Sequence, residues 1–276
     1  MRILLAILAV SFLAPAVHAG DRGREQAVSA YLADLEDLPR GDLTMHTLAA
    51  GEESWTFDVA LYVWAAGMKG HLGARGTEVP VDVGFDEIFD QLEGALMLHA
   101  TARKGRWGGF FDFAWIGLGA DATGPLGQPA SVDSDLFFVE LAVSYRAIEH
   151  PLAERAHLLV DGYAGARIYA AQTDLTLAIG PRSQDGAWVD PIIGFDAMVQ
   201  TGKWLFGMRA DIGGFGLGSD LSWSILLGAR YRFSELLSMA LGYRWLDIDY
   251  KTGSGTDAFT FDVQIAGPVL AVAVSF

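Results

Sequence analysis

Ten stretches of this chain alternate apolar and polar residues with a period of two, and this pattern constrains the fold more than any other feature. Successive side chains of a β-strand point to opposite faces, so the alternation predicts strands with one apolar and one polar face. In the last stretch it continues to the final residue, Phe276. The predicted strands are 54–66, 94–104, 107–119, 134–147, 157–173, 187–200, 203–213, 221–233, 236–250 and 258–276.

The apolar side of the last predicted strand changes along its length. Between Phe259 and Ile265 the apolar residues stand at odd positions, whereas from Leu270 onward they stand at even positions. Gly267 and Pro268 lie at the change, and these are residue types found at β-bulges. We therefore expect a bulge at this point, followed by a strand whose apolar face meets lipid and whose edge pairs with the first strand.

The connections between the predicted strands alternate in length. Very short turns are predicted at 104–106, 201–203 and 234–235, with a moderate connection at 148–156. Longer, acidic or Gly/Pro-rich stretches are 74–92, 120–133, 174–186, 214–220 and 251–257. Short periplasmic turns and longer outer loops are typical of outer-membrane β-barrels. An even number of strands then places both ends of the barrel on the periplasmic side.

The longest of these loops contains the sequence FDEIFDQL, in which Phe85, Ile88, Phe89 and Leu92 share one face of a helix. A short helix that caps or enters the mouth of the barrel is one interpretation. An ordinary excursion of two long strands is the alternative.

Composition supports a membrane barrel. The chain is 51% hydrophobic and rich in glycine, with a mean hydropathy of +0.28, yet its formal net charge is −15. After residue 19 no run of 18 apolar residues without a charge is present, and only helices and closed barrels satisfy every backbone group in lipid. The acidity argues against nucleic acid as a partner, and the absence of cysteine excludes disulfides.

The first residues have the pattern of a secretory signal. Arg2 precedes an apolar run from Ile3 to Ala14, and small residues lead up to Ala19. We expect 1–19 to be a cleaved signal peptide, 20–52 a periplasmic N-terminal arm, and 53–276 an outer-membrane β-barrel. An uncleaved membrane anchor is the alternative reading of the first segment.

Charged residues fall almost wholly on one face of the predicted strands. In a barrel of about ten strands (8–12) this face becomes a narrow charged lumen, because Arg or Lys facing mid-bilayer costs about 2–4 kcal/mol. In a soluble sandwich the same face would be the solvated one. The predicted lumen charges are Asp58, Arg103, Asp112, Glu140, Arg146, Asp161, Arg167, Asp190, Asp196, Arg209, Asp211, Arg230, Arg232, Arg244 and Asp262.

Bulky side chains on the same face predict a plugged or tightly constricted lumen, because a barrel of this size is largely filled by its own side chains. The inward-facing bulky residues are predicted to be Tyr62, Trp64, Tyr163, Tyr169 and Trp188.

Catalytic patterns are weak. Barrel proteases use an Asp-x-His pair, which this sequence lacks, and neither His99 nor His157 has a serine two residues away. No spacing typical of metal ligands is present. We therefore predict no catalytic residue, no metal, no cofactor and no enzymatic activity.

Several motifs in order resemble those of a broad family of largely uncharacterised proteobacterial outer-membrane β-barrel proteins. They are Tyr62-x-Trp64, the Gly-Arg-Trp-Gly turn at 105–108, and Gly-Tyr-Arg at 242–244. The resemblance covers about 54–276 and implies architecture and location, since no shared activity is established for the family. The N-terminal arm is a departure from it.

The predicted function is that of an integral outer-membrane barrel with a structural or narrow-channel, porin-like role for small solutes. The alternatives are a surface binding or adhesion module acting through loops 74–92, 120–133 and 174–186, and, less favoured, a barrel enzyme acting on lipids. Expected partners are outer-membrane lipids and lipopolysaccharide, and the barrel-assembly machinery, for which Phe276 is the predicted assembly signal. We expect a monomer in the outer membrane of a Gram-negative bacterium.

Overall fold

The computed structural model describes residues 54–74, 77–123, 129–177, 180–255 and 258–276. The predicted signal peptide and N-terminal arm lie outside the described residues. Within the described ranges, no helix is long and apolar enough to cross a membrane. The elements are β1 Trp55–Trp64, β2 Gly67–Ala74, β3 Thr77–Val83, α3 Phe85–Phe89, β4 Leu92–Lys104, β5 Trp107–Thr123, β6 Pro129–Ala153, β7 Ala156–Leu177, β8 Gly180–Thr201, β9 Trp204–Gly213, β10 Leu221–Arg232, β11 Leu237–Thr252 and β12 Phe259–Ser275.

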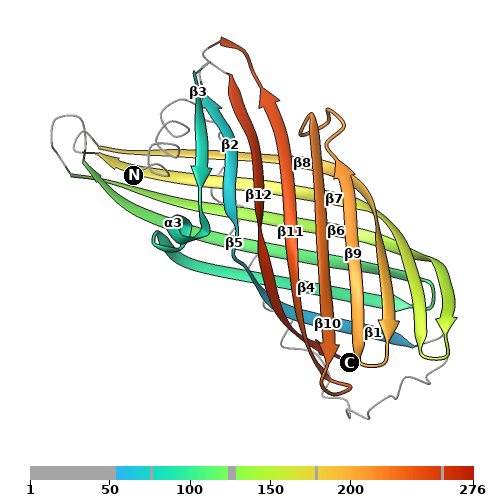
Figure 1. Cartoon of the computed structure of the whole chain (residues 1–276). Helices are drawn as coiled ribbons and strands as arrows, with labels where there is room; N and C mark the ends of the chain where they lie inside the picture. Colours follow the sequence, from blue (N-terminus) through green and yellow to red (C-terminus); the bar gives the residue numbers. More distant parts are fainter. Residues whose placement is uncertain (1–53, 75–76, 124–128, 178–179, 256–257) are drawn as a thin grey trace, which may run out of the picture.

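Ten antiparallel strands close into one barrel (Figure 1). Hydrogen-bonded neighbours follow the order β1-β4-β5-β6-β7-β8-β9-β10-β11-β12, and β12 pairs back onto β1. The closure extends to the last residue, since the amide of Phe57 donates to the carbonyl of Phe276 at 2.7 Å and the amide of Phe276 donates to that of Phe57 at 2.9 Å. Each of these ten strands corresponds to one of the ten predicted from alternation.

Two further strands extend the wall beyond the barrel proper. The edge of β12 pairs with β2 over Phe259–Ala266 and then with β1 over Val269–Ser275. On their other side β1 pairs with β4, whereas β2 pairs with β3. Figure 1 shows β3, β2, β12 and β11 rising together, while β5–β8 run toward a different side.

The chain between β1 and β2 crosses β12 at Gly267. A Cβ atom at this position would overlap the carbonyl oxygen of Ala65 and press on the Cα atom of Ala66. Glycine therefore permits the close backbone approach at which β12 exchanges one partner strand for the other.

The predicted connections are shorter in the structure, because several hairpins remain paired beyond the predicted strand ends. β6 and β7 continue through the predicted connection 148–156 and leave only 154–155 as a turn. The predicted loops 120–133 and 174–186 are also largely strand. Alternation weakens in these extensions, which explains why the sequence pattern missed them.

The prediction of a long loop with a short helix at 74–92 was only partly correct. The short helix is confirmed as α3, but β3 fills most of the stretch between β2 and the helix. No residue of α3 is buried; Ile88 packs against the inner apolar cluster while Phe85 and Phe89 are exposed. The helix therefore contributes the side chain of Ile88 to the edge of the inner apolar cluster and exposes its two phenylalanines.

The predicted bulge at Gly267-Pro268 was wrong. β11 and β12 pair in an unbroken register from Leu237–Val274 to Thr252–Phe259. Odd positions of β12 face inward throughout, so Val263 and Ile265 are buried in the interior while Leu270 and Val272 are exposed on the outside. The apolar residues change sides because the environment changes along the barrel, and the backbone does not slip.

Candidate functional site

A chain of ion pairs and hydrogen bonds crosses the interior at mid-height. We call this set the ionic belt: Asp112, Glu140, Arg167, Asp211 and Arg244. Arg167 donates to Glu140 at 2.6 Å and to Asp211 at 2.8 Å, and Arg244 donates to Glu140 at 2.8 Å and lies 3.5 Å from Asp112. Every belt side chain is at most 13% exposed, so the pairs are shielded from bulk water.

Tyrosines and a histidine complete the hydrogen bonding of the belt. The hydroxyl of Tyr62 donates to Asp112 at 2.8 Å, and that of Tyr163 donates to Asp211 at 3.0 Å. Nδ1 of His99 lies 2.9 Å from the other carboxylate oxygen of Asp112. Each belt carboxylate thus has at least two partners, which is the condition for burying a charge without a large penalty.

The belt joins opposite walls. Around the ring of ten strands, β6 and β11 are separated by four strands on either side. Glu140 on β6 and Arg244 on β11 are nevertheless in direct contact at 2.8 Å. Their side chains therefore span the diameter of the barrel and obstruct the lumen at this level.

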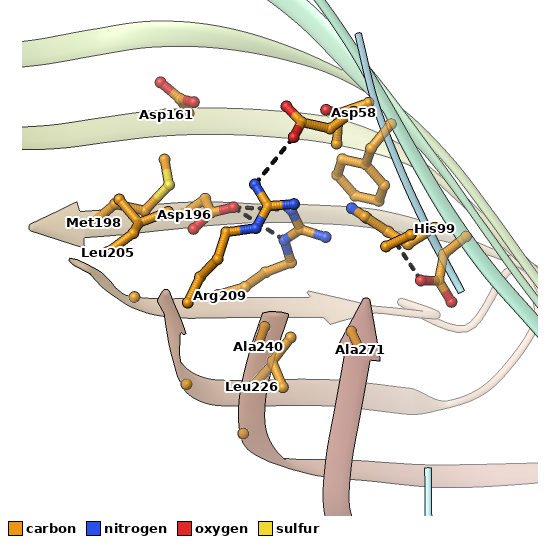
Figure 2. A pocket seen from close by; sticks show the side chains of 18 of the residues that line it. Asp58, His99, Asp161, Asp196, Met198, Leu205, Arg209, Leu226, Ala240 and Ala271 are labelled. Atoms are coloured by element: carbon orange, nitrogen blue, oxygen red, sulfur yellow. Dashed lines mark hydrogen bonds and ion pairs between the residues drawn. The ribbon is translucent and has the colours of Figure 1, made fainter. Parts of the chain in front are cut away.

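A cavity of about 440 Å³ lies between the belt and the end of the barrel with the short turns. We call it the lower chamber. Its lining includes Arg103, Gln200 and Arg232, each within a few residues of a short turn. Figure 2 shows Arg209 beside Asp196 in this cavity, together with apolar side chains such as Leu226.

On the other side of the belt the interior is apolar. Trp188 is stacked between Tyr169, at 4.9 Å between ring centroids, and Tyr250, at 4.3 Å. Leu246 and Ile248 of β11 are fully buried in the same cluster. Packed rings and aliphatic side chains form a second layer that obstructs the lumen above the belt.

Along the barrel axis the interior changes from charged to apolar, and the outer surface changes from apolar to charged. Around the belt and lower chamber it carries exposed apolar side chains, including Leu61, Val143, Leu227, Leu241 and Val272. Above Trp245 the outward positions of β11 become Asp247, Asp249 and Lys251, and Lys251 forms ion pairs with Asp249 and Asp262. β11 thus reverses the polarity of both of its faces near Trp245, since Leu246 and Ile248 are buried inside while Asp247, Asp249 and Lys251 lie outside.

Twelve of the fifteen predicted lumen charges line the lower chamber: Asp58, Arg103, Asp112, Glu140, Arg146, Asp161, Asp196, Arg209, Asp211, Arg230, Arg232 and Arg244. Arg167 is also inside, buried within the belt. The five bulky residues predicted to face inward, among them Trp64 and Tyr163, are buried or packed against the inner cluster.

The other two predicted lumen charges, Asp190 and Asp262, do not line the chamber. Asp190 is buried, but it accepts hydrogen bonds from the amide of Ser219 at 2.6 Å and the hydroxyl of Ser222 at 2.7 Å, and so anchors the 214–220 turn. The prediction for Asp262 was wrong: it stands at an even position of β12, on the outer face, near Lys251 at 3.8 Å. The error follows from the bulge that was expected and is absent.

The sequence did not reveal the partners of the belt carboxylates. His99 shares its inward face with Arg103 because both stand at odd positions of β4, so alternation could have placed it in the lumen. Its contact with Asp112 depends on the pairing of β4 with β5, in which these two residues are directly opposite. Phe276, the predicted assembly signal, is exposed and stacks on Phe57 at 5.8 Å.

In the part of the chain that the structure describes, no group of three or more His, Asp or Glu side chains could hold a metal ion. That the protein has no cofactor and no enzymatic activity remains a prediction from the sequence.

No family model matches the chain, and no curated protein matches it in sequence. Among solved structures, Ail, the attachment invasion locus protein of Yersinia pestis, is similar at 13% identity and a TM-score of 0.38, over 81% of this chain and 99% of that one. Neisserial surface protein A has 14% identity and a TM-score of 0.34, over 81% and 100%. The outer membrane protease OmpT from Escherichia coli has 9% identity and a TM-score of 0.44, over 84% and 99%. At these values the architecture stated above rests on this chain's own strand pairing.

The belt predicts that Arg167→Met destabilises the protein strongly, because Glu140 and Asp211 would lose a buried cationic partner. Breaking a buried ion pair typically costs about 3–5 kcal/mol. The free energy of unfolding, measured by urea titration with tryptophan fluorescence, should fall by this amount. Asp211→Asn in the same chain should restore part of the loss.

Arg232→Met is the matched control, since no ion pair of Arg232 is found among the described residues. Its effect should stay below about 1 kcal/mol. Equal, small losses for both variants would show that the belt does not stabilise the fold.

Proposed function

We propose that this chain is an integral outer-membrane β-barrel of a Gram-negative bacterium with a structural role and a closed lumen. The observation that carries the proposal is the reversal of polarity at one height. Below it the outside is apolar and the inside is ion-paired, and above it the outside is charged and the inside is apolar. Water-soluble proteins rarely expose a continuous apolar surface as large as this outer band.

The length of the apolar band supports insertion in a bilayer. Aromatic residues mark its ends at Trp107 and Trp115 on β5, and at Trp223 and Tyr231 on β10. Each interval spans about nine residues, which matches the 9–11 residues of a tilted transmembrane strand. Aromatic girdles at both interfaces are typical of such barrels.

Closure of the lumen favours a structural role over free diffusion. The ionic belt and the aromatic layer follow each other along the axis, and both are buried. A narrow-channel role for small solutes would require both layers to move. The lower chamber is the feature that supports it, since it provides polar space inside one half of the barrel.

Surface binding is the second candidate function. The strands β11, β12, β2 and β3 continue past the apolar band as a paired sheet, with Lys69 and Asp82 among its exposed charges. Such a sheet would present a fixed surface outside the membrane.

We further propose insertion by the barrel-assembly machinery with Phe276 in its signal, contact with lipid and lipopolysaccharide, and a monomeric state.

Insertion is tested by two arginine substitutions on the outer face of β12. Leu270→Arg places a cation in the apolar band and should lower the free energy of unfolding in lipid vesicles by about 2–4 kcal/mol. Gln264→Arg, on the same strand face but above the band, should have little effect, because Gln264 is exposed and lies 3.3 Å from Asp247. Equal tolerance of both variants would contradict the membrane position proposed for the band.

The closed lumen is tested by planar-bilayer recording of the wild-type chain. Insertion is verified in the same preparation by the faster gel mobility of the unboiled protein. We expect no stepwise current, because two packed layers separate the chamber from the far end. Regular current steps at low voltage would show an open path and would favour the channel role.

A further inference from the structure

The lower chamber is cationic at its short-turn end, although the chain as a whole carries a formal net charge of −15. Five arginines line this end, and only three carboxylates do so. The arginines are Arg103, Arg146, Arg209, Arg230 and Arg232, and the carboxylates are Asp58, Asp161 and Asp196. The belt carboxylates line the other end of the chamber together with Arg244, and they are already held by Arg167, Arg244 and the tyrosines.

The excess of positive charge has a structural origin. Arg103 and Arg146 both form an ion pair with the single carboxylate of Asp161. Arg209 is paired with Asp196 at 2.9 Å and Arg230 with Asp58 at 3.1 Å. Among the described residues no carboxylate forms an ion pair with Arg232, which leaves one arginine available at the wall of the cavity.

Arg230 and Arg232 are two positions apart on β10 and both line the chamber. Two guanidinium groups on one strand face repel each other, and the one carboxylate beside them, Asp58, is paired with Arg230, so a further anion near Arg232 would be favourable. Arginine is also the side chain best suited to carboxylate recognition, because its planar group donates two parallel hydrogen bonds.

The remaining wall of the chamber is apolar. Leu159, Met198, Leu205, Leu226 and Ala271 contribute to its lining, and several of them are seen around the cavity in Figure 2. A volume of about 440 Å³ falls within the usual range of small-molecule sites, which combine apolar walls with a few placed polar groups. Inorganic anions would leave this apolar wall without a partner.

We propose that the lower chamber is a binding site for a small organic anion, a carboxylate with an apolar body, whose carboxylate is held by Arg232 and the neighbouring Arg230. The apolar body lies against Met198, Leu205 and Leu226. The ligand enters from the short-turn end, since the belt obstructs the other side. This site does not require that the protein conducts, so it stands apart from the structural role proposed above.

Isothermal titration of 4-phenylbutyrate into the full chain in lipid nanodiscs tests the site, with empty nanodiscs as the reference. We expect saturable binding at one site. The neutral 4-phenylbutyramide has the same shape without the charge and should bind at least tenfold more weakly. This comparison uses the wild-type chain and so does not depend on any variant.

Variants locate the site. Arg232→Gln should weaken the binding of 4-phenylbutyrate at least tenfold, while Arg232→Lys, which keeps the charge but loses the two parallel hydrogen bonds, should weaken it less. Arg155→Gln is the matched control, because Arg155 lies exposed in the β6–β7 turn outside the chamber and its loss should change nothing. Four results would each overturn the proposal. They are the absence of saturable binding heat, equal binding of the amide and the carboxylate, tighter binding of inorganic phosphate than of 4-phenylbutyrate, and unchanged binding in Arg232→Gln.

Discussion

The contact between Arg244 and Glu140 is the interaction on which the interior depends. It joins strands on opposite sides of the ring at 2.8 Å, and both partners have further links to Arg167 and Asp112. A buried charge without a partner is strongly unfavourable, so each member of the belt fixes the position of the next. This network holds the walls at a set distance and divides the lumen into a polar chamber and an apolar layer.

The division of the interior determines the outer surface. Where the inside is charged, the outward positions must supply the apolar contacts, and the opposite holds above Trp245. One strand therefore changes the polarity of both faces without any change in backbone register, as β12 shows between Ile265 and Leu270. The position of the ionic belt along the barrel axis therefore determines where the apolar band on the outer surface ends.

Alternation was sufficient to predict the ten barrel strands, their lumen face and most of its charges, because a closed wall imposes a period of two. The prediction failed near Gly267, where the apolar residues move from odd to even positions. This shift was interpreted as a bulge, although it reflects a change of environment on the two faces, and Asp262 was misplaced as a result. The extension by β2 and β3 was missed because it depends on pairing with β12. Contacts such as His99 with Asp112 require the register between strands, which a single sequence does not contain.

The central claim is that the reversal of polarity along β12 marks the edge of the membrane. The chain has no cysteine, so single cysteines with a nitroxide label can be placed at positions 264, 266, 268, 270, 272 and 274. Power saturation in bilayers should show access to a water-soluble nickel chelate at 264 and access to oxygen at 270 and 272, with the change near 268. Equal access to the nickel chelate at all six positions would contradict the account.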